Sequence, residues 1–256
     1  MQASKVAKRL QYFSEEQLAG LDKARVPHHV AIIPDGNRRW ARSRFFLPFM
    51  GHEKGAENVI TIAKAAKELG IQAITLYLFS TENWSRDSFE TTALMQLFER
   101  FAIQQRPAML EHGIRFHMIG AVDKLPAKTL NALETTCRAT SNCSDIDVIA
   151  ALNYGSRDEL KRAFLNIIDD IDQKKLTKEM ITEKMISNYL DTSNWPDPEL
   201  LIRTSGEFRI SNFLLWQLSY AEMHIARIHW PDFTPQHLLE ALLSYQNRER
   251  RQGGGG

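Results

Sequence analysis

The stretch HVAIIPDGNRRW, residues 29–40, decides the fold of this 256-residue chain. Its first five residues form an unbroken apolar run, which predicts a strand that is buried on both faces. Pro34 favours extended geometry at Ile33 and so ends the strand, while Gly36 permits a tight turn. The residues that follow begin a helix. A buried strand, a turn and a helix in succession are typical of α/β proteins with a parallel sheet.

The same alternation continues along the chain. We expect further strands over residues 71–79, 114–119, 146–152, 200–202 and 223–228, and helices over residues 51–69, 91–110, 125–140, 157–171, 178–189 and 235–250. This pattern predicts one α/β domain with a central, mostly parallel sheet of about six strands flanked by helices. We place the domain at residues 25–256, after a loosely attached N-terminal helical extension over residues 1–24.

Composition excludes several classes of protein. The chain has 32 basic and 31 acidic residues and a net charge of +1, which argues against a dedicated nucleic-acid binder. Two cysteines without a CxxC spacing fit a reducing compartment. We find no secretory h-region and no apolar run that approaches ~18 residues. We therefore expect a cytoplasmic protein that is at most peripheral at the inner membrane face.

Charged and polar groups gather directly after the first strand. Arg38 and Arg39 lie at the predicted helix start, where free N–H groups and guanidinium groups together favour an anion such as phosphate. Asp35 is out of place beside an anion unless a Mg²⁺ ion lies between them. On spacing alone, an Asp-Gly-Asn turn with solvated arginines explains this segment equally well.

Two later segments have a similar character. FSTENWSR, residues 79–86, follows the next strand, at the strand end where open α/β sheets bind ligands. Taken alone, it is more typical of a polar loop in which Ser or Thr caps the next helix. RTSGEFRISN, residues 203–212, places two arginines on either side of a glycine turn, and we expect Ser211 to cap a helix over residues 212–218. Two arginine-rich sites in a near-neutral chain indicate that the protein binds two anionic groups of its ligands.

Other catalytic signatures are missing from the sequence. We find no GxxxxGK[ST], GxGxxG or GxSxG motif, which argues against a P-loop enzyme, a dinucleotide-binding enzyme and a serine hydrolase. The eight histidines show no HExxH spacing for a metal.

Four ordered motifs resemble the cis-prenyltransferase family, in particular its bacterial undecaprenyl diphosphate synthases. They are HVAIIPDGNRRWA, GHEKGAENV, LYLFSTENWSR and IRTSGEFRISNFLLWQLSYAE, and the similarity runs from about residue 28 to residue 253. The resemblance implies a homodimer, dependence on Mg²⁺ and an apolar product tunnel beneath the sheet. It also implies an enzyme that repeatedly condenses isopentenyl diphosphate onto an allylic diphosphate such as farnesyl diphosphate. The product would be undecaprenyl diphosphate, the lipid carrier precursor for cell-wall synthesis, which would give transient contact with a membrane.

The resemblance also assigns residues. It implies that Asp35 and Asn83 are catalytic and that Asp35 and Glu222 are associated with the metal. It implies a mobile loop over residues 80–88 and a C-terminal R-x-G motif, residues 251–253, that reaches the neighbouring subunit. The residues implied to bind the two diphosphate substrates are Gly36, Asn37, Arg38, Arg39, Trp40, His52, Ser80, Trp84, Arg86, Arg203, Arg209 and Ser211.

The chain departs from the usual family pattern at Pro34, Arg38, Pro48 and Phe208. Pro48 stands where an arginine usually helps to bind diphosphate. A stripe of apolar residues at helical spacing is either a wall of the product tunnel or simple core: Leu94, Leu97, Phe98 and Phe101.

Three alternatives stay open at this stage. The same chemistry could give a shorter or longer polyprenyl product, because product length depends on tunnel volume. A non-catalytic accessory subunit of the same fold would lack Asp35 and the motif arginines, which this chain has. A phosphate-ester hydrolase would need a positioned nucleophile or base, for which we see no motif.

Overall fold

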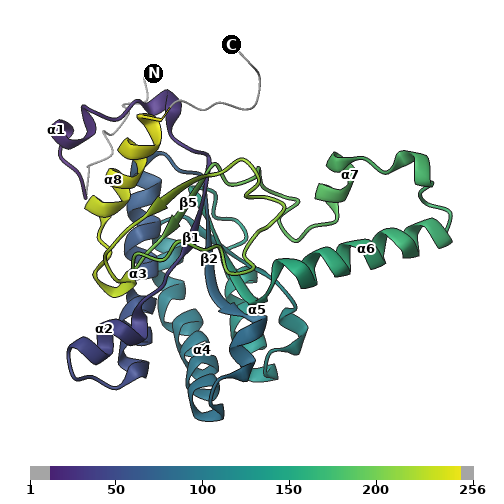
Figure 1. Ribbon diagram of the computed structural model, residues 1–256. Helices are drawn as coiled ribbons and strands as arrows, with labels where there is room; N and C mark the ends of the chain where they lie inside the picture. Colours follow the sequence, from purple (N-terminus) through teal and green to yellow (C-terminus); the bar gives the residue numbers. More distant parts are fainter. Residues whose placement is uncertain (1–11, 249–256) are drawn as a thin grey trace, which may run out of the picture.

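The computed structural model describes residues 12–248 and is built around one twisted sheet (Figure 1). All six strands run parallel, in the order β3-β4-β2-β1-β5-β6. The predicted α/β architecture with about six strands is therefore confirmed. The strands are β1 (His29–Ile33), β2 (Ala73–Ser80), β3 (Ile114–Ile119), β4 (Ile146–Tyr154), β5 (Leu200–Arg203) and β6 (Glu222–Ile225).

Most helices lie close to their predicted positions. They are α1 (Glu15–Leu18), α2 (Asn37–Ser43), α3 (Pro48–Leu69), α4 (Ser88–Glu111), α5 (Ala127–Ala139), α6 (Ser156–Asp172), α7 (Glu183–Asn188) and α8 (Pro235–Gln246). The predicted helix over residues 212–218 is wrong, because this segment is a series of turns. Ser211, Asn212 and Leu214 have φ angles of 52°, 62° and 46°, which a right-handed helix does not allow. Ser211 therefore caps no helix.

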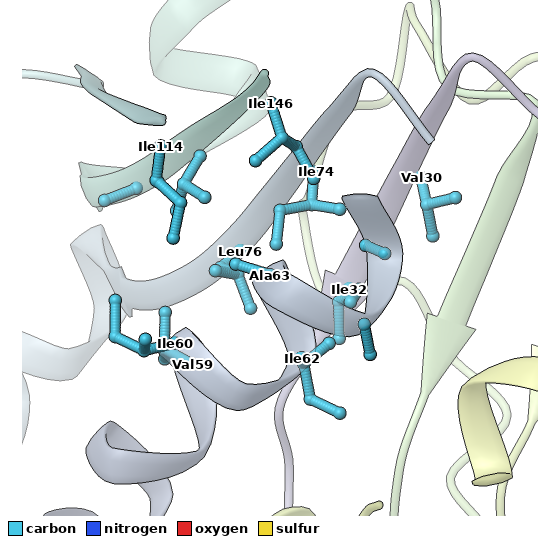
Figure 2. Packing of buried hydrophobic residues seen from close by; sticks show 14 of the residues in the cluster. Val30, Ile32, Val59, Ile60, Ile62, Ala63, Ile74, Leu76, Ile114 and Ile146 are labelled. Atoms are coloured by element: carbon cyan, nitrogen blue, oxygen red, sulfur yellow. The ribbon is translucent and has the colours of Figure 1, made fainter. Parts of the chain in front are cut away.

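Helix α3 covers one face of the sheet. Pro48 occupies its first turn and Gly70, with φ of 95°, ends it, which is the usual placement of these two residues. Figure 2 shows its apolar side chains, among them Val59 and Ile62, packed against those of the central strands, among them Ile32 and Leu76. These residues are almost completely buried, so burial of this face is a main source of stability.

Residues 212–218 help to cover the opposite face of the sheet, although they do not form a helix. Phe213 and Leu214 are fully buried there against strand residues such as Ala31 and Leu201. The ring of Phe213 stacks on Tyr77 with centroids 4.5 Å apart. Both faces of β1 are thus buried, as its unbroken apolar sequence predicts.

The N-terminal segment is attached more firmly than predicted. Phe13 and Leu21 are buried in the main core, and the backbone N–H groups of Tyr12 and Phe13 donate hydrogen bonds to Glu68. The expectation of a loosely attached extension is therefore wrong for residues 12–24. Residues 1–11 lie outside the described part of the chain. Within residues 12–248, none of the helices combines the length and apolar composition that a membrane crossing requires.

Helices α2 and α3 pack closely against each other at Gly51. A Cβ atom at this position would lie 2.0 Å from the backbone oxygen of Asn37 and 3.2 Å from the Cβ of Ala41. Only glycine fits this contact, and the contact fixes the first turn of α2 relative to His52, one residue after Gly51.

We predict that Gly51→Ala lowers the free energy of unfolding by about 1–3 kcal/mol, because the added methyl group overpacks the α2–α3 contact. Helix propensity alone predicts the opposite sign, since alanine favours a helix by up to about 1 kcal/mol over glycine. Urea denaturation measures the difference. Gly20→Ala is the control, because its Cβ would meet nothing closer than 3.8 Å. Equal stability of Gly51→Ala and the wild type would contradict the close contact.

Candidate active site

The site begins where two neighbouring strands end. Ile33 of β1 pairs with Arg203 of β5, so the turns that follow both strands lie side by side. The hydroxyl groups of Thr204 and Ser205 donate hydrogen bonds to the backbone oxygen of Asp35, at 2.7 and 2.9 Å. A Cβ on Gly36 would lie 2.0 Å from the Ser205 hydroxyl, so the turn tolerates only glycine there. The first and third sequence motifs thus form one structure.

Three arginines surround the carboxylate of Asp35. Arg203 donates a hydrogen bond to it at 2.9 Å, and guanidinium nitrogens of Arg39 and Arg209 lie 3.3 and 3.9 Å away. Burial on its own would raise the pKa of Asp35, but the hydrogen bond and charge of Arg203 and the charge of Arg39 outweigh it and lower the pKa below its usual value. Asp35 is therefore ionised at neutral pH.

Glu207 is a site residue that the sequence interpretation missed. Its carboxylate accepts a hydrogen bond from Arg39 at 2.7 Å and forms a second, short one with Arg209. The two guanidinium groups come from motifs that are far apart in the sequence, and Glu207 holds them together. Its position two residues before Arg209 in the third motif was the available signal.

A cavity of about 880 Å³ opens beside these residues. Six arginines but only three carboxylates line it, so it has an excess of positive charge in a chain that is nearly neutral overall. Such an excess favours an anionic ligand. The cavity is lined by twelve of the predicted residues: Asp35, Gly36, Asn37, Arg38, Arg39, His52, Ser80, Asn83, Arg86, Arg203, Arg209 and Ser211.

The other end of the cavity is apolar. The predicted stripe of α4 lines it, together with side chains from α3 and β2: Leu94, Leu97, Phe98 and Phe101 with Ala56, Val59 and Leu78. The stripe therefore serves both as core and as cavity wall. One cavity joins a cationic end to a hydrocarbon end, which suits a ligand that is itself anionic at one end and apolar at the other.

The segment after β2 connects the second motif to the third. A short 3₁₀ helix, Thr81–Ser85, follows the strand, and the Ser80 N–H donates a hydrogen bond to the side-chain oxygen of Asn83 at 3.1 Å. Asn212 donates a hydrogen bond to Glu82 at 2.9 Å. All three arginine-bearing motifs therefore border one cavity.

Three predicted residues do not line this cavity. The Trp40 indole is buried and donates a hydrogen bond to Asp232 at 2.8 Å, and the Trp84 indole donates one to Asn153 at 2.7 Å. Both indole N–H groups are therefore paired within the protein and not directed at a ligand in this cavity.

The third of these residues is Glu222, which lies at the start of β6, in an ion pair with Arg248 at 2.7 Å. It pairs with Leu200, three residues before Arg203 on the neighbouring strand. One chain therefore does not bring Glu222 to Asp35. The predicted R-x-G motif, residues 251–253, lies outside the described residues.

His52 lies partly buried in the wall of the cavity. Its Nε2 atom has no hydrogen-bond partner among residues 12–248 and lies 3.9 Å from Glu90, which also forms ion pairs with Arg86 and Arg38. Burial, followed by the charge of Arg86, lowers the pKa of His52 to about 4. The imidazole is neutral at pH 7 and is available to hydrogen-bond a ligand in the cavity.

These features define a site for molecules with an anionic head and a hydrocarbon tail, and comparison with known proteins gives the family. Residues 33–253 match the family model described as "Putative undecaprenyl diphosphate synthase". The chain belongs to the cis-prenyltransferase family.

Individual relatives are similar over most of their length. The chain is 46% identical to the isoprenyl transferase of Bacillus anthracis, over 91% of this chain and 90% of the relative. The crystal structure of lavandulyl diphosphate synthase from Lavandula x intermedia with dimethylallyl diphosphate has a TM-score of 0.88 and 34% identity, over 90% of this chain and 100% of that one. A probable undecaprenyl diphosphate synthase from Campylobacter jejuni has a TM-score of 0.75 and 28% identity, over 89% and 99%.

We predict that the imidazole of His52 titrates at about pH 4 and not near 6.5. The free energy of unfolding should fall as the pH drops through this interval, because the unfolded chain takes up the proton first. Addition of inorganic pyrophosphate should raise the pKa of His52, since a nearby anion favours the imidazolium form. The measurement is the Cε1–H resonance by NMR.

His29 is the control for this titration. Burial also lowers its pKa to about 4, but it lies in the sheet, bonded to Pro196 and Thr75, and does not line the cavity. Its titration should not respond to pyrophosphate. A His52 midpoint near 6.5, or the same midpoint with and without pyrophosphate, would contradict the placement of His52 beside an anion site.

Proposed function

We propose that this protein repeatedly condenses isopentenyl diphosphate onto an allylic diphosphate, with farnesyl diphosphate as the primer and undecaprenyl diphosphate as the product. The observation that carries the proposal is the single cavity with an arginine-rich end and an apolar end. Every substrate and prenyl product of this reaction likewise has an anionic diphosphate at one end and an apolar hydrocarbon chain at the other. The names of the relatives, isoprenyl transferase and undecaprenyl diphosphate synthase, support the choice of reaction and product.

The two groups of arginines suit two diphosphates. We assign the allylic diphosphate to the first turn of α2, where Asn37, Arg38 and Arg39 line the cavity. We assign isopentenyl diphosphate to Arg203, Arg209 and Ser211, on the other side of Asp35. Arginine suits both tasks because its planar fork binds phosphate oxygens in pairs. The growing chain then lies along the apolar wall of α4.

The residues of the site fit a magnesium ion that arrives with the substrate. Among the described residues there is no group of three or more His, Cys, Asp or Glu side chains that could hold a metal on its own. Mg²⁺, however, is commonly bound by one or two carboxylates together with substrate phosphates, and Asp35 is an ionised, partly exposed carboxylate at the cavity wall. When bound, Mg²⁺ would offset the negative charge of the departing diphosphate.

The side chains of the cavity have three tasks in this reaction. As the allylic carbon–oxygen bond breaks, the guanidinium groups of Arg38 and Arg39 stabilise the negative charge that develops on the leaving diphosphate. Arg203 and Arg209 hold the second substrate so that its double bond faces the allylic carbon, where the new carbon–carbon bond forms. The isopentenyl unit then loses a proton, which the departing diphosphate can accept, and the new double bond forms. Asn83 and Arg86 lie on the segment after β2, whose closure over bound substrates would exclude water from the reactive carbon.

We also propose that the protein is a homodimer. Helix α6 and the short helix α7 project from the body of the molecule (Figure 1). One side of α6 is buried, yet Phe164, Leu165 and Ile168 are exposed, as is Ile181 beyond it. Contiguous exposed apolar side chains on a projecting helix indicate a surface that another chain covers. A second copy of this chain, presenting the same surface, is the occupant we propose.

We predict that incubation with farnesyl diphosphate, labelled isopentenyl diphosphate and Mg²⁺ yields undecaprenyl diphosphate, identified by chromatography of the product lengths. Asp35→Asn should lower kcat by about 10²–10³, the typical cost of losing one group that stabilises developing charge. Asparagine is preferred to alanine because it still offers an acceptor to the buried Arg203 guanidinium. Because it also removes the anion, the thermal unfolding of the variant is measured beside its kcat to separate a loss of activity from a loss of folding.

Asp123→Asn, in the short 3₁₀ helix Val122–Lys124, is the matched control: Asp123 is exposed and does not line the cavity, so this variant should retain full activity. An Asp35→Asn variant that keeps more than about a tenth of the wild-type kcat, a change of only ~1.4 kcal/mol, would reject the role of Asp35. Release of phosphate without chain growth would favour the hydrolase, and products of another length would correct the undecaprenyl assignment.

A further inference from the structure

The segment that joins α2 to α3 exposes an unusual number of apolar side chains. It reads FFLPFM, residues 45–50, and five of these residues are exposed: Phe45, Phe46, Leu47, Phe49 and Met50. Phe89, in the first turn of α4, is exposed as well. We call these six residues the apolar rim. Large contiguous apolar surfaces of this kind on a protein mark a site of interaction.

The backbone holds Phe45 outward at a cost. The N–H of Phe46 donates a hydrogen bond to Ala41 and that of Phe45 to Arg42, the arrangement with which many helices end. Phe45 occupies the left-handed position of this arrangement, with φ of 58°, where glycine is normally found. Its side chain is 99% exposed, so packing within the described chain does not compensate for the strained conformation.

The apolar rim adjoins a second cavity next to the substrate cavity. Phe49 and Phe89 line a second cavity of about 200 Å³ between the first turns of α3 and α4. Leu94 and Leu97 form part of the walls of both cavities. The second cavity therefore lies between the exposed phenylalanines and the apolar wall of the substrate cavity, with Leu94 and Leu97 between the two cavities.

Positive charge accompanies the rim. Between Gly36 and His52 the sequence contains four arginines and no acidic residue. Arg42 and Arg44, immediately before Phe45, are exposed. Arg44 lies over the Trp40 ring at 4.4 Å and forms an ion pair with Asp232, whereas Arg42 reaches from α2 toward the cavity mouth. Aromatic and aliphatic side chains beside arginines are the composition of segments that rest in the interface of a bilayer with anionic lipids.

We propose that the apolar rim docks on an anionic lipid bilayer, with Phe45 and Leu47 inserted among the lipids and Arg42 and Arg44 at the headgroups. The sequence interpretation limited membrane contact to the lipid product, whereas the exposed rim provides a contact that belongs to the protein. In that orientation the second cavity lies at the bilayer surface, which places the apolar wall of the substrate cavity close to the membrane that takes up a hydrocarbon product. Docking itself needs no turnover and is therefore tested separately from the proposed reaction.

Phe45→Gly is the decisive variant. Glycine relieves the left-handed strain, so the midpoint of thermal unfolding should stay the same or rise, while the inserted ring is lost. We expect the wild type to co-sediment with vesicles of phosphatidylcholine and phosphatidylglycerol, and only weakly with phosphatidylcholine alone. Phe45→Gly combined with Leu47→Ser should lower the partition coefficient at least about tenfold.

Ile103→Ser with Leu110→Ser is the matched control. It removes two exposed apolar side chains from the later turns of α4, away from the rim, and should bind vesicles as the wild type does. All three proteins should sediment alike in the absence of vesicles.

Three outcomes would overturn the docking proposal. One is wild-type protein that does not bind the anionic vesicles, or binds neutral vesicles equally well. Another is equal binding by the wild type and the Phe45→Gly/Leu47→Ser variant. The third is a change of oligomeric state in that variant alone, which would assign the rim to contact with a second copy of the chain.

Discussion

The ion pair between Arg203 and Asp35 is the constraint on which the site depends. Arg203 is only 3% exposed, and a buried guanidinium is strongly destabilising unless an anion and hydrogen-bond acceptors surround it. Asp35 supplies the anion at 2.9 Å, while the backbone oxygen of Arg209 and the Ser211 hydroxyl accept hydrogen bonds from the Nη1 atom of Arg203. Because β1 and β5 are neighbours in the sheet, this pair forms where both strands end and draws the segment after β5 onto the segment after β1.

The distribution of charge follows from this arrangement. Arg39 of the first motif and Arg209 of the third motif both lie near the Asp35 carboxylate. Both arginines also donate hydrogen bonds to the carboxylate of Glu207. Three carboxylates do not balance six arginines, so the cavity has an excess of positive charge. A bound diphosphate would neutralise this excess. The sheet and α4 close the other end with hydrocarbon. The same fold thereby separates a polar end for chemistry from an apolar end for the product.

The sequence predicted those features that depend on local signals. Unbroken apolar runs gave the strands, and Pro34 and Gly36 gave the turn that presents Asp35. The helix predicted over residues 212–218 failed because Phe213 and Leu214 pack onto the sheet, and this tertiary burial overrides the helical propensity of the segment. Trp40 and Trp84 were assigned to substrate, yet their indole N–H groups bond Asp232 and Asn153, partners 192 and 69 residues away that no local pattern reveals.

The central claim is that one cavity holds two diphosphates on either side of Asp35. A crystal structure of the protein with Mg²⁺, isopentenyl diphosphate and a non-reactive thio analogue of farnesyl diphosphate tests it most directly. The account predicts the allylic diphosphate against Asn37, Arg38 and Arg39, the second diphosphate against Arg209, and the farnesyl chain beside Leu94 and Phe98. Both diphosphates on the same side of Asp35, or a farnesyl chain outside the apolar end, would contradict it.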